Sequence, residues 1–125
     1  KTEAARKALP DTVPHHDAVF NLGHASLVTA ALIQGEFHIL RTAMKDKLHQ
    51  PYRAHLVPGI DQVLDSAESA GALGACLSGA GPTLLAFTTD DGQVIRDAML
   101  EAWRKLDISA SGHTLQIDKH GVTVE

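Results

Sequence analysis

Apolar residues recur every three or four positions between residues 16 and 34, which is the spacing of one helical face. Further apolar residues fill much of the opposite side, and this is typical of a helix that is buried nearly all round. Gly35 provides a natural C-terminal stop for it. The same spacing, bounded by proline or glycine, predicts three more helices: Thr2–Leu9, Phe37–Leu48 and Pro58–Gly71. The polar stretch His49–His55 is too irregular to predict an element.

The second half of the chain changes to a strand pattern. Two short apolar runs, Leu73–Leu77 and Thr83–Thr88, have the length of buried strands. An amphipathic helix follows, from a predicted cap at Asp90 to Leu106. Alternating apolar and polar residues then predict two C-terminal strands: one around Leu115 and Ile117, and one at Val122–Val124.

This order of elements predicts an α+β fold in which helices pack against an antiparallel sheet. We expect a ferredoxin-like α/β sandwich that occupies residues 1–125 as one domain. Without the short run Val122–Val124 the pattern supplies three strands, one fewer than a four-stranded sheet of that type needs. Because the chain opens directly into Lys1 and Thr2 without an initiator Met, we interpret it as a domain of a longer protein.

Composition narrows the classes of function. The 125 residues are 44% apolar but only 4% aromatic, and the net charge is -4. An acidic balance without a basic run argues against nucleic acid or an anionic membrane as the partner. Cys76 is the only cysteine, which excludes an internal disulfide and favours a reducing, cytoplasmic location. No apolar run in the sequence is long enough to cross a bilayer.

The loop between the two predicted strands is the first candidate site. It reads Leu77-Ser-Gly-Ala-Gly-Pro-Thr83. Glycine permits positive φ and a close approach to the backbone, so Ser78, Gly79, Ala80 and Gly81 are able to present successive N–H groups to an anion. A tight turn without a ligand explains the same residues equally well.

Other catalytic patterns are poorly supported. The eight histidines include no His-x3-His pair, and a single cysteine cannot form a Cys-x-x-Cys pair, so we predict no metal site. Ser78 does not lie in a Gly-x-Ser-x-Gly elbow, and no Walker A sequence is present. Arg6 and Arg53 carry the side chain best suited to hold a carboxylate or phosphate. Residue spacing does not indicate whether they meet.

Four segments together resemble one known family. "LSGAGPTLLAF" is similar to the third signature motif of the GHMP kinases, and three further segments resemble the homoserine kinases among them: "TEAARKALP", "HHDAVFNLGHASLVTAAL" and "DKLHQPYRAHLVPG". The order and spacing are those of the C-terminal half of these enzymes. The resemblance covers almost the whole chain and is weakest after about Asp90.

The resemblance implies transfer of the ATP γ-phosphate to the hydroxyl of L-homoserine, which gives O-phospho-L-homoserine for threonine biosynthesis. It implies that Arg6 and Arg53 hold the substrate carboxylate and that Thr2 lies near the reacting hydroxyl. Ser78, Gly79, Ala80 and Gly81 would support the ATP-phosphate loop. ATP and Mg²⁺ would be held mainly by an N-terminal domain that this sequence lacks, and the resemblance leaves a homodimer open.

Two departures qualify this interpretation. The glycine- and serine-rich ATP loop of the family is absent, so we predict that this chain alone is inactive. His24 stands where relatives commonly carry arginine, and we assign it no catalytic role. Two alternatives stay open: another GHMP kinase that acts on a different small alcohol, and a stand-alone ferredoxin-like module that binds an amino acid for regulation.

Overall fold

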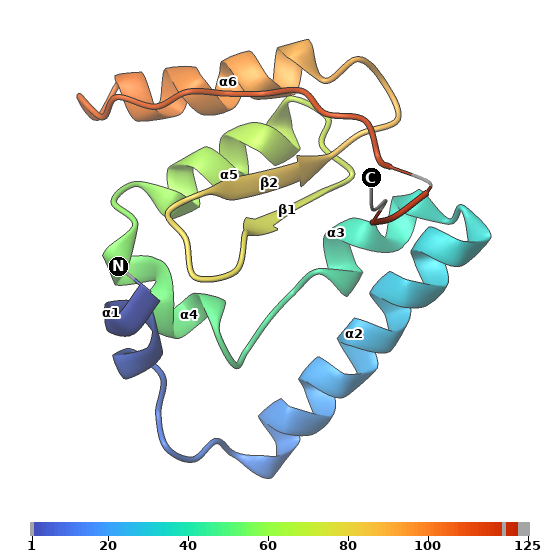
Figure 1. Cartoon of the computed structure of the whole chain (residues 1–125), viewed down its shortest axis with the longest axis vertical. Helices are drawn as coiled ribbons and strands as arrows, with labels where there is room; N and C mark the ends of the chain where they lie inside the picture. The colour runs from blue at the N-terminus through green and yellow to red at the C-terminus, as the bar shows by residue number, and fades with distance from the viewer. Residues whose placement is uncertain (1, 119, 123–125) are drawn as a thin grey trace.

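Figure 1 shows the chain as a computed structural model, which describes residues 2–118 and 120–122. Short helices and one long helix precede a hairpin, and a final helix follows it. In chain order the elements are α1 (Thr2–Lys7), α2 (His15–Gln34), the 3-10 turn η1 (Phe37–Ile39), α3 (Leu40–Ala43), α4 (Gln50–Arg53), the 3-10 turn η2 (Ala54–Leu56), α5 (Ile60–Ser69), β1 (Gly74–Leu77), β2 (Leu84–Phe87) and α6 (Gln93–Arg104).

The two strands form an antiparallel hairpin, with Gly74 paired to Phe87 and Leu77 paired to Leu84. Helices α5 and α6 pack against each other on one side of this hairpin, while α3 contacts β1 and α2 contacts α3. The predicted α+β class, an antiparallel sheet packed by helices, is therefore confirmed.

The core lies mainly between α5, α6 and the hairpin. It has two clusters of buried residues: Val57, Ile60 and Leu77 in one, and Ala67, Ala72 and Ile95 in the other. Trp103 packs against the first cluster and donates its indole N–H to the carbonyl of Pro58 at 3.1 Å. Each buried methylene removes apolar surface from water, which stabilises this half of the molecule.

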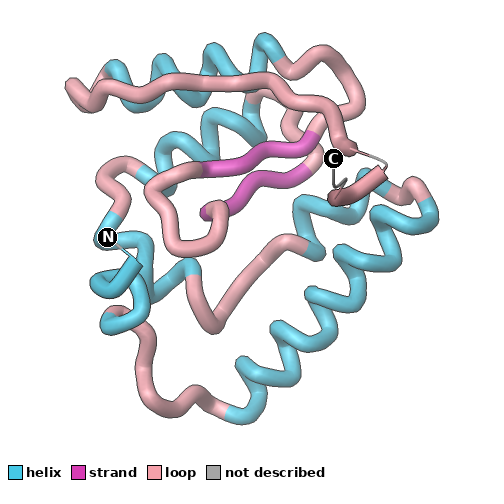
Figure 2. The backbone as a smooth tube through the Cα atoms, viewed as in Figure 1, coloured by secondary structure: helices cyan, strands magenta, loops and turns pink. Residues whose placement is uncertain are grey.

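The predicted C-terminal strands are wrong within the described residues. Leu115 and Ile117 lie in a segment without regular structure that runs beside α6 (Figures 1 and 2), and their exposed fractions are 82% and 71%. Val122 is also exposed outside any strand, and residues 123 and 124 lie outside the described part. An alternating pattern supplies one apolar face, but a strand forms only where the backbone pairs with a neighbour, and this segment pairs with neither strand of the described sheet.

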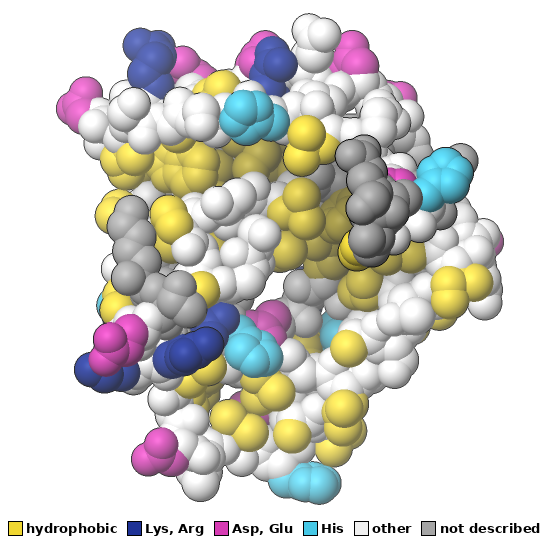
Figure 3. All heavy atoms as spheres, viewed as in Figure 1, with side chains coloured by type: hydrophobic (Ala, Val, Ile, Leu, Met, Phe, Trp, Pro, Cys, Tyr) yellow, Lys and Arg dark blue, Asp and Glu magenta, His cyan; other side chains and the backbone are white. Residues whose placement is uncertain are grey.

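Helix α2 has the predicted length but not the predicted burial. Only Ala31 is fully buried, whereas Leu22 and Ile33 are 71% and 79% exposed. Apolar side chains accordingly reach the surface at the lower right of Figure 3, where α2 runs. The prediction fails because α2 packs mainly against α3 and η1, and more than half of its residues are exposed.

Three local boundaries also differ from the prediction. The helix expected over residues 37–48 ends at Ala43, and the segment expected to be irregular contains α4. Gly92, with φ of 74°, rather than Asp90, occupies the N-cap of α6. The nearby Asp91 carboxylate accepts a hydrogen bond from the Gln93 N–H at 2.9 Å. No described helix combines the length and the apolar character that a membrane crossing requires.

Candidate functional site

The glycine loop joins β1 to β2 and is closed by its own backbone. The Ser78 N–H donates to the Thr83 carbonyl at 2.9 Å, and the Gly81 N–H donates to the Ser78 carbonyl at 3.1 Å. The N–H groups of Gly79 and Ala80 form no hydrogen bond with any described residue. The loop therefore has two successive N–H groups for an acceptor, which is the feature an anion-binding nest needs.

Gly79 and Gly81 in the loop differ in what a larger side chain would meet. Both have positive φ, 60° at Gly79 and 76° at Gly81. A Cβ on Gly79 would meet no atom within 4 Å, whereas one on Gly81 would lie 2.9 Å from Leu77 Cδ1 and 3.2 Å from Val57 Cγ2. Gly81 thus allows the loop to pack against the core, and Gly79 lies on the exposed side of the loop.

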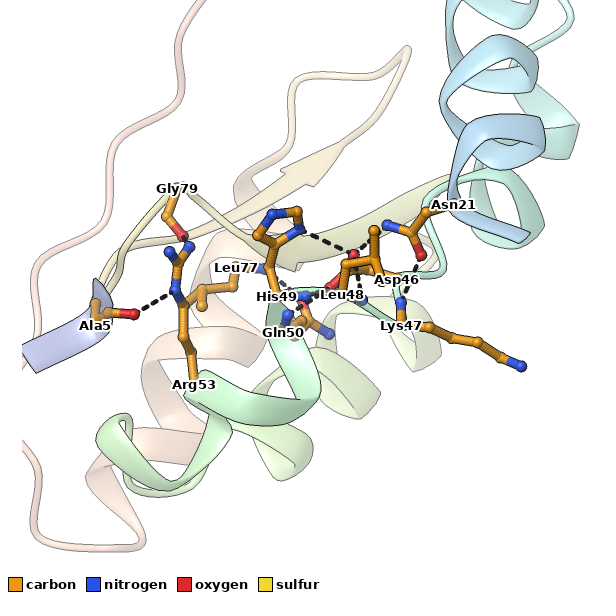
Figure 4. A network of polar contacts seen from close by, with 10 residues as sticks. All are labelled: Ala5, Asn21, Asp46, Lys47, Leu48, His49, Gln50, Arg53, Leu77 and Gly79. Carbon is orange, nitrogen blue, oxygen red and sulfur yellow. Dashed lines mark hydrogen bonds and ion pairs between the residues drawn. The ribbon is translucent and has the colours of Figure 1, made fainter. Parts of the chain in front are cut away.

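Arg53 connects this loop to α1. Its Nε donates to the carbonyl of Ala5 at 3.1 Å, and its Nη1 donates to the carbonyl of Gly79 at 3.1 Å (Figure 4). The Ala5 carbonyl belongs to the end of a six-residue helix, where carbonyls lack helical partners. The guanidinium keeps further N–H donors, including both on Nη2, for a planar acceptor.

Arg6 directly follows the residue that Arg53 contacts. It is exposed on α1, and its side chain forms no hydrogen bond or ion pair with the described residues. Figure 3 shows a group of Lys and Arg side chains at the lower left, over α1 and α4. Thr2 begins α1, and its side chain lies outside the described part. The structure therefore brings α1, Arg53 and the glycine loop together, while Arg6 makes no contact with Arg53 or the loop.

Asp46 organises the start of α4, and the sequence interpretation missed it. Its carboxylate accepts hydrogen bonds from the backbone N–H groups of Leu48 at 3.1 Å, His49 at 2.7 Å and Gln50. The Asn21 amide of α2 donates to the same carboxylate at 2.5 Å (Figure 4). The local sequence gives no capping signal for it, because Asp46 lies three positions before His49, the N-cap residue of α4.

The pKa of Asp46 reflects two opposed effects. Its partial burial alone would raise the pKa of the carboxyl. The hydrogen bonds from Asn21 and from the three backbone N–H groups outweigh this effect and lower the pKa from 3.8 to about 2. The group is therefore a carboxylate at neutral pH.

Gln50 is a second residue that the sequence interpretation missed. Its side-chain Oε1 accepts a hydrogen bond from the Leu77 N–H at 2.7 Å (Figure 4). This contact fixes the first turn of α4 to the end of β1, one residue before the glycine loop. Nothing in the local sequence identifies the partner, because Gln50 and Leu77 are 27 positions apart.

Neither of the two principal cavities contains the predicted site residues. One, of about 470 Å³, lies between α5 and α6, and the other, of about 320 Å³, lies beside α2 and is lined in part by His24 and Cys76. Arg53 and the glycine loop instead form an open surface.

His24 stacks on Phe20 with ring centroids 3.7 Å apart. Burial and the Asp46 charge raise the pKa of the Cys76 thiol.

Metal ligands do not gather in the described part of the chain. No group of three or more His, Cys, Asp or Glu side chains comes together there in a way that could hold an ion. We therefore derive no step in which these residues bind a metal. The chemistry of this surface is that of guanidinium and backbone N–H donors, which suit carboxylate and phosphate oxygens.

Comparisons with known proteins agree on one family. Residues 28–105 match the family model described as GHMP kinases C terminal. A homoserine kinase of Synechococcus sp. is 43% identical over 125 residues, which are 99% of this chain and 41% of that protein. A homoserine kinase of Crocosphaera subtropica is 47% identical over 124 residues, 98% of this chain and 40% of that protein. The chain thus spans about two fifths of the length of these relatives.

Comparison of the fold with solved structures indicates the same family. The crystal structure of homoserine kinase from Cytophaga hutchinsonii superposes with a TM-score of 0.84 and 32% identity, over 87% of this chain and 35% of that one. A putative homoserine kinase from Listeria monocytogenes superposes with a TM-score of 0.57, also at 32% identity, over 82% of this chain and 35% of that one. The resemblance of the glycine loop to the third GHMP motif is therefore supported by the family match and by the fold. The chain belongs to the GHMP kinase family, whose C-terminal domain it contains.

Proposed function

We propose that this chain is the substrate-binding domain of a homoserine kinase, an enzyme that transfers the γ-phosphate of ATP to the side-chain hydroxyl of L-homoserine. The observation that carries the proposal is the position of Arg53, which contacts α1 on one side and the glycine loop on the other. A substrate carboxylate held at this arginine would lie next to a loop suited to phosphate. The names of the relatives supply the substrate.

In this proposal Arg53 and Arg6 hold the carboxylate of homoserine. Arg53 retains free guanidinium donors, and Arg6 lies one residue after the carbonyl that Arg53 contacts. Two guanidinium groups would fix a small amino acid firmly enough to direct its hydroxyl toward the phosphate. We assign Thr2 a place near that hydroxyl, as the family resemblance implies.

The glycine loop has the supporting role. The free N–H groups of Gly79 and Ala80 would hydrogen-bond oxygen atoms of the transferring phosphate, with Ser78 and Gly81 closing the turn. Phosphoryl transfer depends on such positioning and on stabilisation of charge rather than on a strong base. Mg²⁺, when bound with ATP, would neutralise phosphate charge, and we place its ligands outside the described part of this chain.

A chimera tests this function directly. In it, the chain replaces the matching 41% of the Synechococcus homoserine kinase, and phosphorylation of L-homoserine is measured with ATP. We expect turnover by the chimera and none by the 125-residue chain alone. Turnover by the chain alone would contradict a site shared between two domains.

Substitution of Arg53 in the chimera then tests the carboxylate contact. Arg53→Ala should raise the KM for L-homoserine about tenfold or more, because a charge-assisted hydrogen bond is lost. The KM for ATP should change less than about twofold. Arg104→Ala on α6 is the matched control, since the Arg104 side chain pairs, among the described residues, with Glu101 of its own helix. An unchanged homoserine KM in Arg53→Ala would rule out the proposed clamp, and turnover of another small alcohol in preference would indicate a different GHMP substrate.

A further inference from the structure

The network in Figure 4 has a part that the proposed function does not use. Asp46 lies outside α4 and touches neither α1 nor the glycine loop, yet every contact of its carboxylate acts on the segment that leads to Arg53 or on the long helix behind it. Its side chain is only 20% exposed. The inference that follows rests on the proposed function of Arg53.

Helix α4 is too short to hold its own shape. It has four residues, so its first N–H groups have no carbonyl partner within the helix. A single helical turn is also unfavourable in isolation, because several dihedral angles are fixed for one hydrogen bond. The Asp46 carboxylate accepts the first N–H of the helix, that of Gln50, and the N–H groups of Leu48 and His49 in the segment just before it.

The same carboxylate attaches that end to α2. Asn21 donates its side-chain amide to Asp46 and accepts the Lys47 N–H on its own oxygen at 2.8 Å. Asn21 therefore holds both Asp46 and the next residue against a helix of 20 residues. The start of α4 is thus fixed to the longest rigid element of the molecule.

The other contacts of α4 depend on this fixed start. Gln50 in the first turn bonds the Leu77 N–H, and Arg53 at the last position reaches Ala5 and Gly79. A rotation of this one turn about its axis would move both side chains together. The direction of the Arg53 guanidinium is consequently set at the opposite end of the helix.

We propose that Asp46 is a positioning residue for substrate binding: it holds the segment that leads into α4 and anchors it to α2, and thereby directs the Arg53 guanidinium between α1 and the glycine loop. Asp46 does not touch substrate. Its effect should appear in the KM for a substrate that carries a carboxylate, and it should disappear when Arg53 is absent.

The test is a double-mutant cycle in the chimera defined above. Asp46→Ala should raise the KM for L-homoserine about fivefold, because the segment before α4 loses its hydrogen-bond acceptor and its attachment to α2. Asp46→Asn retains one acceptor oxygen and should restore part of that loss. In the Arg53→Ala background, Asp46→Ala should raise the KM no further. Asp65→Ala, at an exposed position of α5, is the control and should leave the KM unchanged.

Two outcomes of this cycle would overturn the proposal. One is an unchanged homoserine KM in a folded Asp46→Ala chimera. The other is an equal KM increase with and without Arg53, which would mean that Asp46 acts on the fold alone. Thermal unfolding of each variant, with kinetics measured well below its midpoint, separates loss of folded protein from a change in KM.

A second measurement keeps the inference testable if the chimera has no kinase activity and the proposed function fails. Hydrogen exchange on the 125-residue chain should show the hydrogen-bonded amides of Leu77, Ser78 and Gly81 exchanging several-fold faster in Asp46→Ala than in the parent or in Asp65→Ala. Unchanged exchange at these amides would show that Asp46 does not hold α4 against the loop.

Discussion

The half of the molecule made by α5, α6 and the hairpin differs in kind from the corner made by α1, α4 and the glycine loop. The first is held by apolar packing, with Val63 and Ala67 fully buried. The second is held by hydrogen bonds between side chains and backbone groups. Arg53 donates to two carbonyls, while Gln50 and Asp46 accept from backbone N–H groups. Packing is non-directional and roughly proportional to buried area, whereas each hydrogen bond fixes a distance and an angle.

This difference separates stability from site geometry. Loss of a packed side chain should lower the free energy of unfolding by a large amount. Loss of a polar contact at the corner should cost less stability but change where a site residue lies. The two regions meet at Leu77, which is buried in the first cluster and whose N–H is bound by Gln50.

The largest expected effect on stability is in the packed half. Ile60→Ala, at a position that is 4% exposed, should lower the free energy of unfolding by about 2–5 kcal/mol, because burial is lost and a cavity remains. Val94→Ala on α6, where the valine is 70% exposed, should change it by less than about 0.5 kcal/mol. Urea unfolding followed by circular dichroism measures both, and equal losses at the two positions would contradict the described core.

The glycine loop gives a sharper comparison, because Gly81 and Gly79 differ in packing but not in the sign of φ. Gly81→Ala should cost about 2 kcal/mol, since the new Cβ adds a close contact with Leu77 and Val57 to the left-handed strain. Gly79→Ala has the strain alone and should cost about 1 kcal/mol. Thermal unfolding of the two variants gives the order, and a larger loss at Gly79 would place the packed face of the loop elsewhere.

The third expected effect on stability concerns acid. The pKa of Asp46 is lower in the folded chain, about 2, than its ordinary 3.8. A lowered folded-state pKa contributes stability above the unfolded-state value, and this stability is lost as the pH falls from about 5 toward 2. The contribution at neutral pH should be about 1–2 kcal/mol, less than the full shift because the carboxylate keeps some contact with water.

Unfolding titrations between pH 7 and 2 measure that contribution. Asp46→Asn should lose it at neutral pH and show a flatter dependence on pH than the parent chain. Asp65→Asn, which changes an exposed carboxylate, should follow the parent curve. A parent curve that matches Asp46→Asn at every pH would show that the carboxylate is not held as described.

Residue spacing alone predicts the helices and strands that depend on neighbouring residues in the sequence. The spacing of apolar residues placed α2, α5 and α6 to within a few residues, and the two apolar runs placed the hairpin. The glycine loop, Arg6 and Arg53 were identified from residue chemistry and a family resemblance, and the family is confirmed by a match over residues 28–105. The individual roles of these residues stay predictions until the substitutions are made.

Which helix faces are covered, and which distant side chains meet, depends on how the elements pack in the folded chain. Helix α2 is apolar on most sides, yet many of its apolar side chains are exposed, and the segment with Leu115 and Ile117 pairs with neither strand of the described sheet. Asp46 meets Asn21 across 25 positions, and Arg53 meets Ala5 across 48. Local preference acts over one turn or one strand, whereas these contacts depend on how distant elements pack, and so the alignment of Arg53 with the glycine loop belongs to the fold rather than to any motif.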